Sequence, residues 1–219
     1  MIPIPPNERL DAELASLESI KPAGIDMNYF HNQANEVDES VECGWGKEAA
    51  LKYIKGQRSN IKNRATIIGD YGVNAEGSGD MYFKGSNLLN AIRSIYDNDE
   101  LWWDTFRDYT ATYKHKIIET QTVEDFFNKP IKTDLQPIFD QYLRHSRIPE
   151  LQFKKEGKTF SYRWRADVEG FNMPVDVFID GKETRLKPTM EWKKLDKKVS
   201  GKDSIKLNDL EFYVNMSFK

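Results

Sequence analysis

The chain of 219 residues is long enough for one large or two small domains, and its hydrophobic content of 39% is ordinary for a globular protein. A formal net charge of -3 argues against a basic surface for nucleic acid or for an anionic membrane. The single cysteine excludes an intrachain disulfide and any metal site built from several cysteines.

Residues 1–40 show no pattern that links them to the rest of the chain, and we interpret them as an N-terminal appendage of unassigned role. No basic stretch followed by an apolar run is visible at their start, so no export signal is predicted and the cytoplasm is the default expectation. No apolar run approaches the length of a membrane span, so we expect no membrane contact.

Residues 41–149 carry the 3.6-residue hydrophobic period of amphipathic helices. Thr122 and Asp125 have the spacing of a capping box and predict the start of a short helix. Residues 66–80 are punctuated by glycines and predict a loop. One-sided stripes with short links favour an all-α helical subdomain. The other helical patterns run from Lys47 to about Ile61, from Leu88 to Tyr96, from Asp99 to Lys116 and from Leu135 to Leu143. The pattern at 99–116 includes an aromatic stripe that is predicted to pack in the core, made of Trp102, Phe106, Tyr109 and Tyr113.

Beyond Pro149 the hydrophobic period changes from 3.6 to 2, which indicates strands. Asp180 and Gly181 separate two alternating runs, and this dipeptide is typical of a type I′ hairpin turn. About six short strands within residues 150–219 predict a small antiparallel β-sandwich. The predicted fold class is therefore multidomain, α then β.

The stretch 76–87 (EGSGDMYFKGSN) places an aromatic pair between glycines, just before the apolar face that contains Leu88 and Ile92. Glycines allow unusual dihedrals and close backbone approach, and the run puts the Tyr82 hydroxyl near the start of a helix. From spacing alone, Tyr82 is predicted to be a buried packing residue, because aromatic side chains beside an apolar stripe usually pack in the core.

Tyr82-Phe83-Lys84-Gly85 followed by an apolar helix resembles the Tyr-x-Lys-Gly segment of the M1 family of zinc aminopeptidases, which includes leukotriene A4 hydrolase. The similarity to the bacterial branch runs from residue 41 onward and includes VECGWGKEAA at 41–50, IIGDYGV at 67–73 and LQPIFDQYL at 135–143. The resemblance implies that the Tyr82 hydroxyl stabilises the oxyanion of a tetrahedral intermediate. A neutral phenol suits that role because it donates a hydrogen bond to developing negative charge. The resemblance also implies an immunoglobulin-like form for the C-terminal sandwich.

The family binds zinc through a helical His-Glu-x-x-His motif and a further Glu, which lie upstream of the matched region. This chain has three histidines, His31, His115 and His145, and no two of them are four residues apart. A helical zinc pair needs that spacing so that both imidazoles leave one face of the helix. We therefore expect no metal ligands, no general base and no cofactor in this chain, whereas the full-length family carries zinc.

In the family, the loop before this tyrosine approaches the substrate cleft, which makes Glu76 and Asp80 candidate substrate-binding residues by resemblance. Their sequence context alone favours turn chemistry in a surface loop. Family members of the bacterial type commonly carry export signals, so the resemblance implies an exported parent enzyme.

Three functions remain open. The chain is the downstream portion of an M1-type aminopeptidase, inactive alone, that meets peptides only when an upstream domain completes it. Alternatively, it is a non-catalytic peptide- or protein-binding module derived from that fold, or one half of a split peptidase. Loss of upstream domains would expose apolar surface, so we also expect self-association or association with a missing catalytic half.

Overall fold

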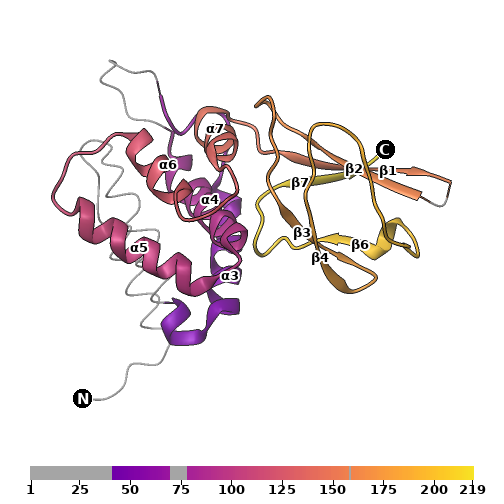
Figure 1. Ribbon diagram of the computed structural model, residues 1–219, viewed down its shortest axis with the longest axis horizontal. Coiled ribbons are helices and arrows are strands. Elements are labelled where there is room, and N and C mark those ends of the chain that lie inside the picture. The colour runs from indigo at the N-terminus through magenta and orange to yellow at the C-terminus, as the bar shows by residue number, and fades with distance from the viewer. Residues whose placement is uncertain (1–40, 70–77, 158) are drawn as a thin grey trace.

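The computed structural model describes residues 41–69, 78–157 and 159–219. Helices occupy the first part and strands the second, so the predicted order of α then β is confirmed (Figure 1). The helical region comprises a helical stretch at 41–45, α3 (Lys47–Gly56), the 3-10 helix η1 (Gln57–Asn60), α4 (Asp80–Tyr96), α5 (Asp99–Tyr113), α6 (Thr120–Asn128) and α7 (Gln136–Arg144). The β region comprises β1 (Glu150–Glu156), β2 (Thr159–Arg165), β3 (Val175–Ile179), β4 (Lys182–Leu186), β5 (Lys193–Lys194), η2 (Lys202–Ser204), β6 (Ile205–Leu207) and β7 (Asn215–Phe218).

Helix α4 is the most deeply buried helix of this region, with buried residues along almost its whole length. Leu88 and Ile92 of the predicted apolar face are 2% and 0% exposed. The helix begins at Asp80, however, so Tyr82 and Gly85 lie inside it and not before it. An aspartate in the first turn is favourable at the positive end of the helix dipole. The glycine-rich sequence of residues 66–80 predicts a loop instead, so it does not indicate that a helix begins at Asp80.

Helices α5 and α6 pack through aromatic side chains, as the stripe in α5 predicts. Trp102, Phe106 and Tyr109 are buried. The ring centroids of Trp102 and Tyr109 lie 5.6 and 5.3 Å from that of Phe127 in α6. Such distances are typical of aromatic pairs in protein cores.

Two helix ends differ from the prediction. Helix α5 ends at Tyr113, before the expected end. Helix α6 begins at Thr120, so the predicted capping box at Thr122 is wrong. The Thr122 amide bonds to the Glu119 carbonyl at 3.0 Å, as it would in a first helical turn. Helix ends depend on such local bonds more than on the apolar period.

The β region forms two sheets, of strand order β5-β2-β1-β7 and β4-β3-β6 (Figure 1). Every pair is antiparallel except β1 with β7, in which Glu150 faces Asn215 in parallel. The predicted antiparallel arrangement is therefore confirmed for the other pairs and wrong for this one. The chain passes through the three-stranded sheet before it returns to β1, and only such a crossover permits parallel pairing.

The predicted hairpin between β3 and β4 is confirmed. Asp180 and Gly181 have φ angles of 49° and 78°, and the flanking residues Ile179 and Lys182 face each other across the pair. Positive φ at both central residues is the requirement of a type I′ turn, whose twist matches that of the strands.

One hydrophobic core runs through the helical and the β regions. Segment 208–214, which precedes β7, also joins them through its backbone carbonyls. Asn90 Nδ2 donates to the Leu210 carbonyl at 3.0 Å, and Tyr142 Oη donates to the Tyr213 carbonyl at 2.7 Å. The helices and the sheets are therefore both packed and hydrogen-bonded to each other.

Candidate functional site

Tyr82 lies in the first turn of α4, on a side of the helix that is not fully buried. Asp80, Met81 and Lys84 are buried, whereas Tyr82 and Ser86 are half-buried. The Tyr82 side chain packs against the hydrophobic core. It is therefore a residue at the edge of the core and not a fully buried one.

Lys84, in the same segment, lies on the buried side. It is 0% exposed, and its Nζ donates to the carbonyls of His145 and Ser146 at 2.9 and 2.8 Å. Both carbonyls belong to the link between α7 and β1, so the ammonium group ties α4 to that link. Burial lowers the pKa of Lys84 to about 8, although Asp80 and Asp167 act in the opposite direction.

Asp80, the first residue of α4, is 3% exposed. One of its carboxylate oxygens accepts the Lys62 backbone N–H at 2.7 Å, and the other accepts the Asn63 backbone N–H at 2.6 Å. These bonds fix the chain that follows η1 to the first residue of α4. Asp80 therefore has a structural role at the start of α4. The substrate contact that the resemblance implies for Asp80 stays a prediction. Glu76, the other candidate, lies outside the described residues.

Replacement of Asp80 by asparagine should destabilise the fold, because asparagine offers one acceptor oxygen where two amides need acceptors. An amide left without its partner costs about 1–3 kcal/mol. We expect the free energy of unfolding in denaturant to fall by that amount. The exposed Asp108→Asn in α5 should stay within about 0.5 kcal/mol of wild type. Equal stabilities for the two variants would show that the two amides find other acceptors.

The histidines are not brought together. His115 is exposed after α5, His145 is half-buried after α7, and His31 lies outside the described residues. In the part of the chain that the structure describes, no histidine belongs to a group of three or more metal-ligating side chains. The expected lack of a zinc site stays a prediction.

A polar cavity of about 450 Å³ lies where the ends of α4 and α5 meet the three-stranded sheet. Its basic side chains are Lys47, Arg93 and Arg185. Arg93 is 3% exposed and donates to Glu42 at 2.5 and 2.8 Å and to Asp99 at 2.9 Å. Lys47 Nζ donates to both oxygens of Asp99 at 3.1 and 2.8 Å. Carboxylates on the helical side of the cavity therefore hold two of its three cations.

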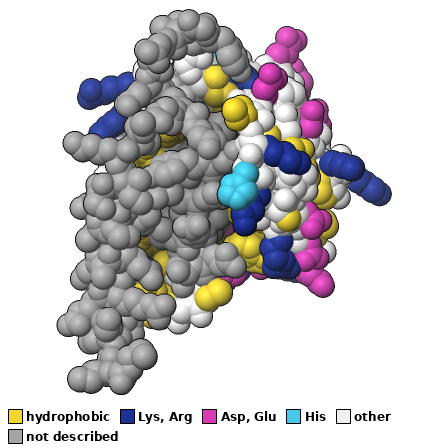
Figure 2. Space-filling view, turned by 90° about the vertical axis from the view of Figure 1, so that its left-hand side faces the viewer, with side chains coloured by type: hydrophobic (Ala, Val, Ile, Leu, Met, Phe, Trp, Pro, Cys, Tyr) yellow, Lys and Arg dark blue, Asp and Glu magenta, His cyan; other side chains and the backbone are white. Residues whose placement is uncertain are grey.

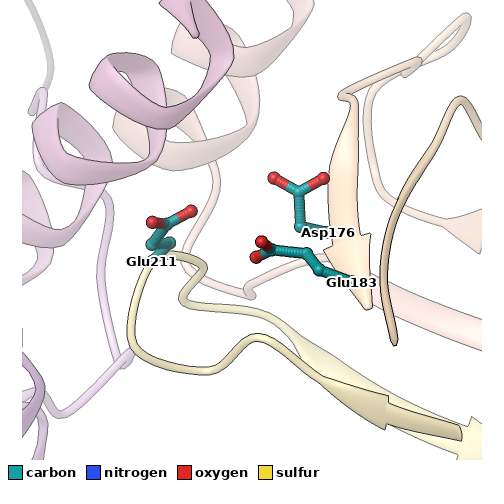
Figure 3. A group of neighbouring side chains, drawn as sticks. All are labelled: Asp176, Glu183 and Glu211. Carbon is teal, nitrogen blue, oxygen red and sulfur yellow. The ribbon is translucent and has the colours of Figure 1, made fainter. Parts of the chain in front are cut away.

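Three carboxylates also line the cavity, and Figure 3 shows Glu211 opposite Asp176 and Glu183 of the sheet. Asp176 comes from β3, Glu183 from β4 and Glu211 from segment 208–214, and one carboxylate oxygen of each lies within 4.8 Å of the other two. Arg185 donates to both oxygens of Asp176 at 3.0 and 2.7 Å, and this pairing raises the pKa of Arg185. A guanidinium already neutralises Asp176, so the group is an internal charge network.

Lys84 has no role of its own among the sequence-based predictions, and the cavity is absent from them, for different reasons. Lys84 precedes Leu88 by one helical turn, so the period itself placed a lysine on the apolar face of α4. That lysine was a readable signal of a buried, hydrogen-bonded ammonium group. The cavity left no such signal, because segments far apart in the sequence supply its lining.

The face of the molecule drawn in Figure 2 shows no large patch of one side-chain type among the described residues. In Figure 2, basic, acidic and hydrophobic side chains are interspersed among the described residues. The large hydrophobic side chains exposed in the described ranges are Trp45, Ile117 and Phe218, which lie in three different segments. Among the described helices, none combines the length and the apolar character that a membrane crossing requires. Self-association and binding of a catalytic half stay predictions.

Comparison with known proteins gives no assignment. No family model matches this chain, and no curated protein matches it. Its function therefore has to be inferred from the residues and their geometry.

Proposed function

We propose that this chain is the downstream portion of an M1-type zinc aminopeptidase and is inactive alone, because the zinc ligands and the general base belong to an upstream part. In the completed enzyme, which removes N-terminal residues from peptides, the chain contributes the Tyr82 hydroxyl. That hydroxyl donates a hydrogen bond to the oxyanion of the tetrahedral intermediate. The upstream part would hold zinc, which would supply Lewis-acid chemistry at the same carbonyl.

The arrangement of segment 82–85 carries this proposal. Lys84 and Gly85 are buried in the same helical turns in which Tyr82 keeps a partly open side. Lys84 is bonded to the link after α7, and Asp80 is bonded to the chain before α4. A donor to an oxyanion must be held on a rigid element with its polar end toward the reacting group, because small displacements reduce its effect. Tyr82 meets the first of these requirements.

The immunoglobulin-like form of the β region belongs to the same proposal. Two sheets of four and three strands, mostly antiparallel, support it. Trp164 of β2 is 1% exposed, packs edge-on against Phe171, and donates through Nε1 to the Met173 carbonyl at 2.8 Å. A buried tryptophan of this kind is a common core residue of such sandwiches.

Zinc content and hydrolysis together test the proposal. The purified chain is analysed for zinc by elemental analysis and assayed against a panel of aminoacyl chromogenic substrates. We expect neither stoichiometric zinc nor hydrolysis for the chain alone, with or without added zinc. Hydrolysis is expected once a separately encoded upstream half that contains the His-Glu-x-x-His helix is added.

Two outcomes would contradict the proposal. Stoichiometric zinc with hydrolysis by the chain alone would mean that ligands are assembled within it, beginning with His31, Glu36 and His115. Saturable peptide binding without hydrolysis, in the presence of the upstream half, would favour the non-catalytic binding module.

A further inference from the structure

The cavity between the helices and the three-stranded sheet brings negative charge together across an interface. Glu211 of segment 208–214 lies opposite Asp176 and Glu183 of the three-stranded sheet, as Figure 3 shows. One carboxylate oxygen of each residue lies within 4.8 Å of those of the other two. Carboxylates at such separations cannot all ionise without a cost in free energy.

The positive groups around the cavity compensate this charge unevenly. Glu183 accepts a hydrogen bond from the Asn208 side-chain amide at 2.9 Å, and Glu211 interacts with the Ser94 side chain. The cavity cations form ion pairs with carboxylates: Lys47 with Asp99, Arg93 with Glu42 and Asp99, and Arg185 with Asp176 and Asp97. Lys47 and Arg185 also interact electrostatically with Glu211. The charged groups that line the cavity with Glu211 are Lys47, Arg93, Asp97, Asp99, Asp176, Glu183 and Arg185.

The proton affinity of Glu211 follows from these surroundings. Burial raises the pKa of Glu211, and Asp176 and Glu183 raise it further, whereas Lys47 and Ser94 act in the opposite direction. A carboxyl group whose pKa is raised by folding binds its proton more readily in the folded chain than in the unfolded chain. Its stabilising effect is therefore full below the pKa of the unfolded chain and is lost as the pH rises through the pKa of the folded chain.

We propose that Glu211 is a proton-controlled latch between the helical region and the three-stranded sheet. When protonated, its carboxyl O–H donates a hydrogen bond to the carboxylate of Asp176 or Glu183 and holds segment 208–214 against the sheet. When ionised, Glu211 repels the carboxylates of Asp176 and Glu183, although Arg185, which is paired with Asp176, offsets part of this repulsion. The segment is then held only by its other bonds. The segment is bonded to α4 through Asn90 and leads into β7, so the latch couples the helices to both sheets.

Carbon-13 NMR of the glutamate carboxyl groups in the full chain measures this titration directly. We expect Glu211 to titrate above the ordinary range of glutamate, and Glu183→Gln to move its midpoint downward. Glu169→Gln, which replaces an exposed glutamate before β3, is the matched control and should leave the midpoint in place. A Glu211 midpoint at or below the ordinary range would overturn the proposal.

Thermal unfolding provides a second readout. Glu211→Gln keeps the size and a donor group of the protonated acid but cannot ionise. We expect its Tm to exceed that of wild type by about 2–4 °C at pH 7 and to match it near pH 4. Equal Tm values at pH 7 would count against the latch.

Hydrogen exchange tests whether protonation of Glu211 stabilises the contact between segment 208–214 and the three-stranded sheet. The Asn208 amide bonds to the Asp176 carbonyl at 3.0 Å. After correction for the intrinsic rate, its protection should increase on acidification in wild type and stay constant in Glu211→Gln. The series is repeated with EDTA and with calcium. Stabilisation by calcium together with loss of the pH dependence in EDTA would mean that a cation binds the carboxylates, and would overturn the proposal.

Discussion

Tyr82→Phe should lower kcat by about 100- to 1,000-fold in a peptidase completed by the upstream zinc-binding half, because one donor to the oxyanion is lost. The ring that packs against the core is kept, so the free energy of unfolding should change by less than about 1 kcal/mol. An interaction made only in the transition state affects kcat and kcat/KM alike, so KM should stay near its wild-type value. Steady-state kinetics on an aminoacyl chromogenic substrate measure all three parameters.

Tyr113→Phe is the matched control for this experiment. Tyr113 is also half-buried, but it ends α5 and its ring packs against Phe126. The resemblance assigns it no catalytic role, so turnover should not change. Wild-type turnover in Tyr82→Phe would contradict the assignment of Tyr82 as the oxyanion donor. A raised KM with unchanged kcat would indicate that Tyr82 acts in substrate binding alone.

Comparison of wild type with Lys84→Met should show that the buried, charged ammonium group of Lys84 lowers the free energy of unfolding at neutral pH. The pKa of Lys84 is lowered from 10.5 to about 8, so the folded chain holds this proton less tightly than the unfolded chain does. Stability therefore rises with pH between these two values. Relative to Lys84→Met, which has no such titration, wild type should gain roughly 2–3 kcal/mol between pH 7 and pH 10. Denaturant unfolding at a series of pH values measures the difference.

The hydrogen bonds of Lys84 should survive this titration. A neutral amine keeps two N–H donors, and the carbonyls of His145 and Ser146 are two acceptors. The exposed Lys206→Met in β6 is the control and should track wild type across the same pH range. A stability difference between wild type and Lys84→Met that does not vary with pH would mean that the folded chain does not disfavour the charged lysine.

The predictable part of the fold is the part that local sequence determines. The apolar period placed Leu88, Ile92 and Tyr109 in the core, and all three are buried. The turn at Asp180 and Gly181 was readable because its requirement for positive φ is confined to two residues. Both features depend on neighbours within one helical turn or one hairpin.

The missed features depend on partners that are distant in sequence. The start of α4 is fixed by hydrogen bonds from the backbone amides of Lys62 and Asn63 to Asp80. No sequence pattern around Asp80 predicts these bonds. The parallel pairing of β1 with β7 likewise depends on the path of the chain through another sheet. Within the candidate site, sequence placed Tyr82 near a helix start. It could not reveal the cavity, because the residues of its lining meet only after folding.

The two neighbours of β1 reach it by different routes, and this has a consequence for assembly. Strand β2 follows β1 through a short hairpin, whereas β7 arrives after the three-stranded sheet has been passed. Closing the longer loop costs more chain entropy before any bond is gained. We expect the β1–β2 hairpin to form early and the β1–β7 pair late, so one edge of β1 stays open during folding. An open strand edge can pair with another chain, so β1 is a site where misassembly can occur while the protein folds.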